Sequence, residues 1–291
     1  NMEFIQFHPT SLYNPGERPS FLITEAMRGF GGLLRLQNGK EFMQKYHPMG
    51  SLAPRDVVAR SIDHELKISG EEFVYLDITH KDPKEVMSHF PNIYKKCLSI
   101  GIDLTKDMIP VVPAAHYCCG GIKVNLNGES SIRRLYALGE ASSTGLHGGN
   151  RLASNSMMEA AVYADAAARH AISVIDSIEL QRDIPAWDYE GTAVPEEMAL
   201  ITQDYKEMQQ IMTNYVGIVR SDVRLERAKR RLEIIFKETE ELYLKSTLSQ
   251  HLCELRNMIA VGYLIIKQAE ARHESVGLHY SIDYPAKPVE I

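Results

Sequence analysis

Long apolar runs and cysteines are both scarce in this sequence of 291 residues. The longest apolar run, residues 258–266, is nine residues long, whereas a membrane-spanning helix needs about 20. Four cysteines are too few for a disulfide framework in a chain of this length. No basic segment followed by an apolar stretch opens the chain, so a secretory signal is not expected. These absences predict a cytoplasmic protein with no membrane segment.

An excess of one charge is also missing. The 32 basic and 38 acidic residues are scattered along the chain and give a formal net charge of -6. A nucleic acid is therefore not an expected partner. The 44% hydrophobic content is enough for one large or two ordinary domains, each with its own core.

Two common site motifs are incomplete. The glycines of residues 29–32 fall short of a dinucleotide fingerprint, because Leu34 stands where the third glycine would be. His116, Cys118 and Cys119 lie within four residues of one another, but a zinc site needs a second ligand cluster, and the sequence offers none. Neither a dinucleotide fingerprint nor a metal site is expected.

The first part of the chain mixes strand and helix patterns. An aromatic and β-branched segment stops at Pro9, which predicts a strand that ends at His8. A proline in the first turn predicts a helix with Arg55 at its N-terminus. Residues 73–78 read as a strand and helical spacing follows them. The patterns indicate an α+β unit over residues 1–112.

The middle of the chain has the pattern of strand, glycine turn, loop and helix. The apolar residues 135–138 predict a short strand. A loop rich in glycine, serine and threonine then leads to an alanine-rich helix over residues 156–175.

A polar connection over residues 176–195 indicates a domain boundary, and three helix-length patterns follow up to residue 274. The last two patterns are amphipathic, as in a helical bundle. The apolar stripe of the middle helix contains Leu225, Ala228, Leu232, Ile235, Phe236, Leu242 and Tyr243. The stripe of the last helix contains Leu252, Leu255, Ile259, Gly262, Ile266 and Ala269.

Four short polar segments are candidates for a binding site, namely residues 7–10, 54–56, 113–117 and 147–151. They carry three histidines and two arginines on loops or at element ends. An arginine fork matches a carboxylate bidentately, so two such groups suit a dicarboxylate. Taken singly, each of these residues is better explained as a surface or capping residue, and spacing alone does not decide between the two.

Long strings in the chain resemble one enzyme family. Residues 2–10 (MEFIQFHPT) and 24–29 (TEAMRG) resemble the capping domain of the succinate dehydrogenase and fumarate reductase flavoprotein superfamily. Further strings are similar to its L-aspartate oxidase branch, at residues 53–56, 113–117, 144–156, 254–257 and 277–285. Departures from the usual pattern fall at Gly149, where members often have alanine, and at Val276, where they often have arginine.

The resemblance implies a fold with three parts. These are an α+β capping domain over residues 1–112, the returning α/β piece of an FAD-binding domain over 113–180, and a C-terminal helical domain over 181–291 that contains a three-helix bundle. The family's first segment, with its glycine-rich flavin fingerprint, has no counterpart here, so the chain is expected to be a C-terminal fragment.

The resemblance also implies a dicarboxylate site formed by His8, Thr24, Glu25, Arg55, His116 and Arg151. In this interpretation Arg151 and His116 hold one carboxylate, and His8 with Thr24 holds the other. His8, His116 and Arg55 are the implied catalytic residues, with Arg55 acting electrostatically during amine oxidation.

Glu140, Asn155, Ser156 and Met157 are the implied contacts to FAD. The helix N-terminus at these last three residues would stabilise an anionic flavin. Without the resemblance, Ser156 is equally well explained as a helix cap. We expect the chain alone to bind FAD weakly or not at all.

The implied reaction is the FAD-dependent oxidation of L-aspartate to iminoaspartate, with O2 or fumarate as acceptor. This reaction begins de novo NAD biosynthesis and hands its product to quinolinate synthase. One alternative is a fumarate reductase or succinate dehydrogenase flavoprotein, although the pairs at residues 114–115 and 118–119 are closer to the aspartate oxidases. A second alternative is a folded fragment without catalysis.

Overall fold

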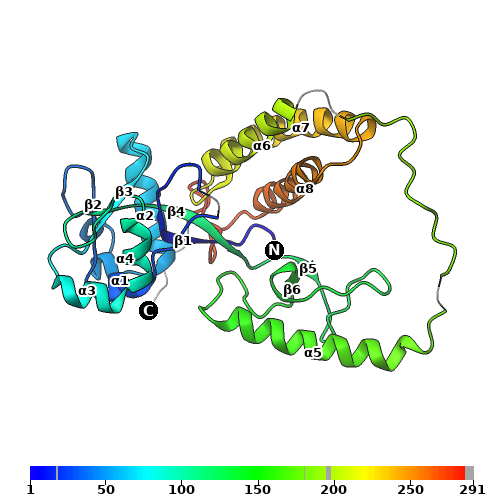
Figure 1. The fold of residues 1–291 in the computed structure, drawn as a ribbon, viewed down its shortest axis with the longest axis horizontal. Helices are drawn as coiled ribbons and strands as arrows, with labels where there is room; N and C mark the ends of the chain where they lie inside the picture. The colour runs from blue at the N-terminus through cyan, green and yellow to red at the C-terminus, as the bar shows by residue number, and fades with distance from the viewer. Residues whose placement is uncertain (18, 180, 195–197, 286–291) are drawn as a thin grey trace. The chain divides into compact units, whose positions relative to one another are not determined.

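The computed structural model describes residues 1–17, 19–179, 181–194 and 198–285 of the chain (Figure 1). The fold is mixed α/β and divides into two compact units. One unit is Gln6–Tyr117, and the other combines Asn1–Ile5 with Cys118–Ile291. The boundaries of the three proposed domains remain a prediction.

The unit Gln6–Tyr117 is built on a four-stranded sheet in the order β1-β4-β3-β2. Its strands are β1 (Ile5–Leu12), β2 (Leu33–Arg35), β3 (Val74–Asp77) and β4 (Ile109–Cys118). Strand β3 pairs antiparallel with both neighbours, with Leu76 opposite Leu34 and Ile109. Its helices are α1 (Glu25–Gly29), η1 (Met43–Lys45), η2 (Gly50–Leu52), α2 (Arg55–Ser69), α3 (Pro83–His89) and α4 (Pro91–Leu98).

Apolar residues from both the sheet and the helices form the core of this unit. Leu34, Leu76 and Ile109 come from the strands, and Ile62 and Val86 come from α2 and α3. The strand expected at residues 73–78 and the helices expected after it are confirmed. The helix expected at Arg55 also begins at that residue, with Pro54 as its N-cap.

The expectation that the first strand ends at His8 is wrong. Strand β1 continues through Pro9 to Leu12. Proline has no N–H to donate, so within a sheet it is tolerated mainly on an edge strand. Since β1 is the outermost strand of the sheet, His8 lies within the strand and not at its end.

The other unit has little sheet. Strands β5 (Ile122–Lys123) and β6 (Ser142–Ser143) pair in parallel, with Ile122 opposite Ser142. Its helices are η3 (Gly139–Ala141), α5 (Asn155–Ile175), α6 (Met198–Ile211), η4 (Met212–Val216), α7 (Asp222–Lys245) and α8 (Gln250–Ala271). Helix α5 confirms the expected alanine-rich helix.

The strand expected at residues 135–138 is wrong. This stretch makes only an isolated bridge between Tyr136 and Glu129 in the part of the chain that the structure describes. Leu135 is 41% exposed while Ala137 is buried. An apolar run of four residues carries too little periodicity to separate a strand from an irregular buried segment.

Helices α6, α7 and α8 pack on one another around a second core (Figure 1). Leu232 and Ile235 of α7 and Leu255 and Ile259 of α8 are buried there, as the apolar stripes predict. The prediction for Phe236 is wrong, because this residue is 48% exposed. Thr239, three residues further along α7, is buried with only 1% of its surface exposed.

Among the described residues, no helix is long and apolar enough to cross a membrane.

Candidate functional site

Two histidines lie next to each other on neighbouring strands. His8 of β1 and His116 of β4 have ring centroids 5.6 Å apart, with their planes at 75°. His8 is only 4% exposed, and the Thr10 amide donates a hydrogen bond to its Nδ1 over 3.3 Å. Because Nδ1 accepts, a neutral His8 ring carries its proton on Nε2. His8 therefore offers one N–H donor to a ligand.

The charge state of His8 follows from its surroundings. Burial, followed by the positive charges of Arg55, His116 and Arg28, lowers the pKa of His8 to about 4, and Glu25 only partly offsets them. The imidazole is therefore neutral at physiological pH. In this state it binds an anion by donating a hydrogen bond and not by its charge.

An acidic residue joins two arginines in the same unit. The Arg55 Nε lies 2.5 Å from one carboxylate oxygen of Glu25, and an Arg28 guanidinium nitrogen lies 3.3 Å from the other. Glu25 is the first residue of α1, and the Thr24 hydroxyl caps this helix by accepting from the Ala26 amide. Glu25 thus holds Arg55 in place while leaving a net positive charge.

Arg28 is a member of this cluster that the sequence did not mark as functional. It is 1% exposed, and its guanidinium donates to the carbonyls of Ser51 and Ala53 over 2.8 and 3.3 Å. The only signal in the sequence is the i,i+3 spacing of Glu25 and Arg28, which is common in surface helices.

Arg151 lies in the other unit, on the loop that leads into α5. It is 8% exposed, and its guanidinium donates to the Ser156 hydroxyl over 3.2 Å. Ser154 precedes the helix with a left-handed φ of 70°, a conformation that costs a residue with a side chain about 1–3 kcal/mol. The chain therefore turns sharply between Arg151 and the helix N-terminus.

Glu159 anchors the same loop to α5, and no motif in the sequence marks this residue as functional. Its carboxylate lies 2.7 Å from Nε2 of His147 and accepts a hydrogen bond from the Thr144 hydroxyl. His147 and Glu159 are both buried, at 9% and 3% exposure. The loop from Thr144 to Arg151 is thereby fixed to one residue of the helix.

The N-terminus of α5 has no side-chain cap. The Ser154 side chain makes no capping hydrogen bond, and the interpretation of Ser156 as the cap is wrong because it is the second helical residue. Asn155 is exposed and Met157 is 79% exposed. The Asn155 amide donates to the Leu152 carbonyl over 3.4 Å, and the Met157 amide donates to the Ser154 carbonyl over 3.3 Å. A helix N-terminus carries partial positive charge, so this end can still attract an anionic or electron-rich group.

Glu140 lies in the short helix η3 and not directly after a strand. Its carboxylate accepts a hydrogen bond from the Cys118 amide over 2.9 Å. Glu140 is exposed. Over the described part of the chain, no group of three histidine, cysteine or acidic side chains is arranged to hold a metal ion.

The expected site residues thus fall into two sets. His8, Thr24, Glu25, Arg55 and His116 belong to Gln6–Tyr117, whereas Glu140, Arg151, Asn155, Ser156 and Met157 belong to the other unit. Within the first set, a dihistidine pair and a salt-bridged arginine form a cationic, hydrogen-bonding surface. Within the second set, a buried arginine adjoins an uncapped helix end.

Comparisons with known proteins cover almost all of the chain. The family described as FAD binding domain matches residues 1–157, and the family described as Fumarate reductase flavoprotein C-term matches residues 205–288. L-aspartate oxidase from Pseudomonas aeruginosa is 49% identical over 285 residues, covering 98% of this chain and 53% of that protein. The enzyme of the same name from Acinetobacter baylyi is 50% identical, covering 98% of this chain and 52% of its own length.

Solved structures similar to this chain are also flavoprotein subunits of fumarate reductases and succinate dehydrogenases. A quinol-fumarate reductase with menaquinol molecules has a TM-score of 0.82 at 29% identity, covering 99% of this chain and 56% of that one. The Sdh1 complex of Mycobacterium smegmatis with UQ1 has a TM-score of 0.78 at 32% identity, covering 98% and 50%. The chain spans about half the length of the curated relatives it matches. It belongs to the FAD binding domain family, within the succinate dehydrogenase and fumarate reductase flavoprotein superfamily, and has L-aspartate oxidases as homologues.

Proposed function

We propose that a protein containing this chain oxidises L-aspartate to iminoaspartate with FAD as cofactor. The observation that carries the proposal is the buried, neutral His8 beside His116, next to the Glu25–Arg55 pair. These groups supply directional hydrogen bonds, and Arg28 beside Glu25 leaves the cluster with a net positive charge, as a dicarboxylate requires. The similarity to L-aspartate oxidases over 98% of the chain supports aspartate as that dicarboxylate.

The proposed substrate contacts follow the two carboxylates of aspartate. His8, with Thr24, binds one carboxylate, and Arg151 with His116 binds the other. A guanidinium is a poor proton carrier, so the proposed role of Arg55 in amine oxidation is electrostatic and not proton transfer. Glu25 contributes to the site by orienting the Arg55 guanidinium through their 2.5 Å contact.

The residues of this chain fit one end of a flavin. The uncapped N-terminus of α5, with Asn155, Ser156 and the exposed Met157, suits the electron-rich edge of the flavin ring. Glu140 suits a hydroxyl of the flavin's sugar chain. When bound, FAD supplies the oxidising power by accepting hydride from the substrate. The chain's own residues bind and orient the substrate.

We propose that the chain has the three domains that its resemblance to the flavoprotein superfamily implies. Residues 1–112 form the capping domain, residues 113–180 return to the FAD-binding domain, and residues 181–291 form the helical domain with its three-helix bundle. The two family matches, at 1–157 and 205–288, support a division between the second and third parts. By itself, the chain is proposed to be inactive and to bind FAD weakly.

The wider role is proposed from the same similarity. With O2 or fumarate as acceptor, the reaction would begin de novo NAD biosynthesis in the cytoplasm and pass iminoaspartate to quinolinate synthase. A fumarate reductase or succinate dehydrogenase activity is the second candidate, because solved flavoproteins of that kind share the fold at TM-scores up to 0.82.

A substrate comparison separates the two candidates. A complete FAD-loaded enzyme containing this chain is incubated with L-aspartate or succinate, and hydrogen peroxide release is measured. Peroxide formation from aspartate, with little from succinate, is the expected result. Turnover of succinate without turnover of aspartate would favour the second candidate.

A further inference from the structure

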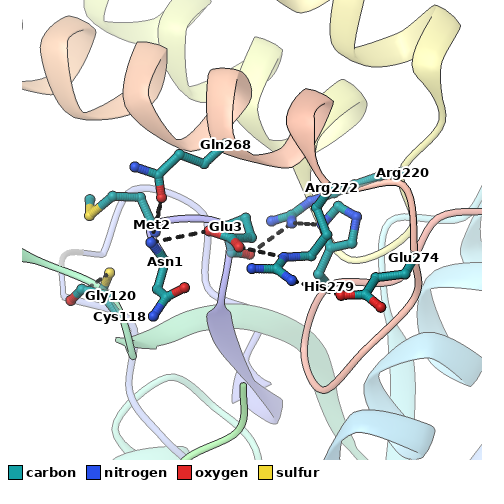
Figure 2. Close-up of polar contacts among 10 residues, drawn as sticks. All are labelled: Asn1, Met2, Glu3, Cys118, Gly120, Arg220, Gln268, Arg272, Glu274 and His279. Atoms are coloured by element: carbon teal, nitrogen blue, oxygen red, sulfur yellow. Dashed lines mark hydrogen bonds and ion pairs between the residues drawn. The ribbon is translucent and has the colours of Figure 1, made fainter. Parts of the chain in front are cut away.

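One buried arginine ties together three distant parts of the unit that carries Arg151. Arg220 is 1% exposed and precedes α7. Its guanidinium donates to the Val216 carbonyl over 2.8 Å. It also donates to the Glu3 carbonyl over 2.7 Å and to Nδ1 of His279 over 2.8 Å (Figure 2). The residue therefore joins the end of η4, the start of the chain and the segment after α8.

The segment 275–282 after α8, which we call the tail, is also held by the Arg220 backbone. The Arg220 amide donates to the Tyr280 carbonyl, and the Ile282 amide donates to the Arg220 carbonyl, both over 3.0 Å. Burial and the Arg220 charge lower the pKa of His279 to about 4, so its ring is neutral and Nδ1 accepts from Arg220. Arg220 therefore holds the tail by three hydrogen bonds, at His279, Tyr280 and Ile282.

A second buried pair adds to this attachment. Glu3 is 2% exposed, and its carboxylate accepts a hydrogen bond from Arg272 Nε over 2.6 Å (Figure 2). Arg272 also donates to Glu274 over 2.9 Å, just before the tail begins. A buried carboxylate is stable as an ion only with such a partner, so Glu3 and Arg272 constrain each other.

The tail meets the loop that carries Arg151. The Leu278 amide donates to the Gly149 carbonyl over 2.9 Å. A Cβ on Gly277, which has a φ of 56°, would lie 2.3 Å from that same carbonyl oxygen. This distance is shorter than any van der Waals contact, so the two backbones can approach only because residue 277 is glycine.

Gly149 lies two residues before Arg151, and His147 lies two residues before Gly149. The loop is thus held on one side by Glu159 of α5, through His147. On its other side it is held by the tail, through Gly149. Two opposed attachments leave the short segment between them little freedom to move.

We propose that the tail braces the loop 144–151 and that Arg220 and Gly277 are positioning residues for Arg151. The substrate role of Arg151 in this proposal rests on the proposed function. Neither residue is assigned a contact with substrate or flavin. Each acts through the backbone contact between Leu278 and Gly149.

The brace itself is tested by hydrogen–deuterium exchange on this chain, with no substrate or cofactor. Gly277→Ala is expected to speed exchange in residues 144–151 by about tenfold or more, because the added Cβ displaces the tail. Gly191→Ala is the matched control, since Gly191 also has a left-handed φ, of 81°, but nothing lies within 4 Å of an added Cβ. Equal loop exchange in the two variants, with the helices still protected, would overturn the brace.

A second pair of variants covers the case in which Gly277→Ala fails to fold. His279→Ala removes the acceptor for Arg220, whereas His279→Asn restores an acceptor near the Nδ1 position. Loop exchange is expected to rise in the alanine variant and to return towards the wild-type rate in the asparagine variant. Wild-type loop exchange in His279→Ala would contradict the proposal.

The consequence for substrate binding is tested in a complete FAD-loaded enzyme. Gly277→Ala is expected to raise KM for L-aspartate by on the order of 10- to 100-fold with flavin content unchanged, since small misplacements of a binding group have effects of this size. Faster loop exchange with an unchanged KM would overturn the positioning role. If the wild-type enzyme does not oxidise aspartate, the proposed function fails, and the exchange experiment still decides on the brace.

Discussion

The folded chain is expected to lose stability in mild acid because of two buried histidines. His8 and His279 both have a pKa near 4 in the folded protein, against an ordinary value of 6.5. Between these values the unfolded chain binds protons that the folded chain does not, so stability falls as pH drops. The stabilisation is fully present above pH 6.5 and is lost as pH falls towards 4.

The size of the effect follows from the two pKa values. Integrating the proton uptake from about pH 7 to about pH 5 gives a loss of about 2 kcal/mol for each histidine. The two residues lie in different compact units, and each unit is therefore expected to weaken. For comparison, a domain of ordinary stability has about 5–15 kcal/mol in total.

Urea denaturation followed by circular dichroism measures this loss. His279→Asn is expected to reduce the drop in unfolding free energy between the two pH values by about 2 kcal/mol. The exposed His251 of α8 provides the matched control, and His251→Asn is expected to retain the wild-type pH dependence. An identical pH dependence in His279→Asn and the wild type would refute the argument.

Three further outcomes are expected. In a complete enzyme, the Arg151→Leu variant is expected to oxidise aspartate more slowly by a factor of roughly 30 to 4000 while keeping its flavin. One charge-assisted contact contributes about 2–5 kcal/mol, which corresponds to this factor. Near-normal turnover would contradict the role of Arg151 in substrate binding. Chelators should leave activity unchanged, because His8 and His116 act by hydrogen bonding, and stoichiometric zinc lost together with activity would reverse this view. When FAD is titrated into the chain alone, flavin fluorescence is expected to show no saturable binding in the low micromolar range. The reason is that Glu140 and the α5 N-terminus would contact only part of the cofactor. Tight binding would contradict this expectation.

Local patterns in the sequence predicted the elements that depend on local physics. The helix at Arg55, the alanine-rich helix α5 and the stripes of α7 and α8 all follow from periodicity and proline position. The errors came from tertiary context. Pro9 did not end β1 because the strand lies at the sheet edge. Phe236 is half exposed although the apolar stripe places it in the core.

The candidate site was less predictable from local patterns than the helices and strands were. Its substrate residues came from resemblance, because spacing alone does not show that His8 and His116 meet across two strands. The contacts between Glu159 and His147 and between Arg220 and His279 join residues 12 and 59 positions apart. Charged residues at such separations look like ordinary surface charges until burial is known.

The most direct test of the central claim is anaerobic reduction of the bound flavin in a complete enzyme containing this chain. Addition of L-aspartate is expected to bleach the visible flavin absorption, and the same addition to the Arg151→Leu variant is expected to bleach it far more slowly. Bleaching by succinate but not by L-aspartate would contradict the account.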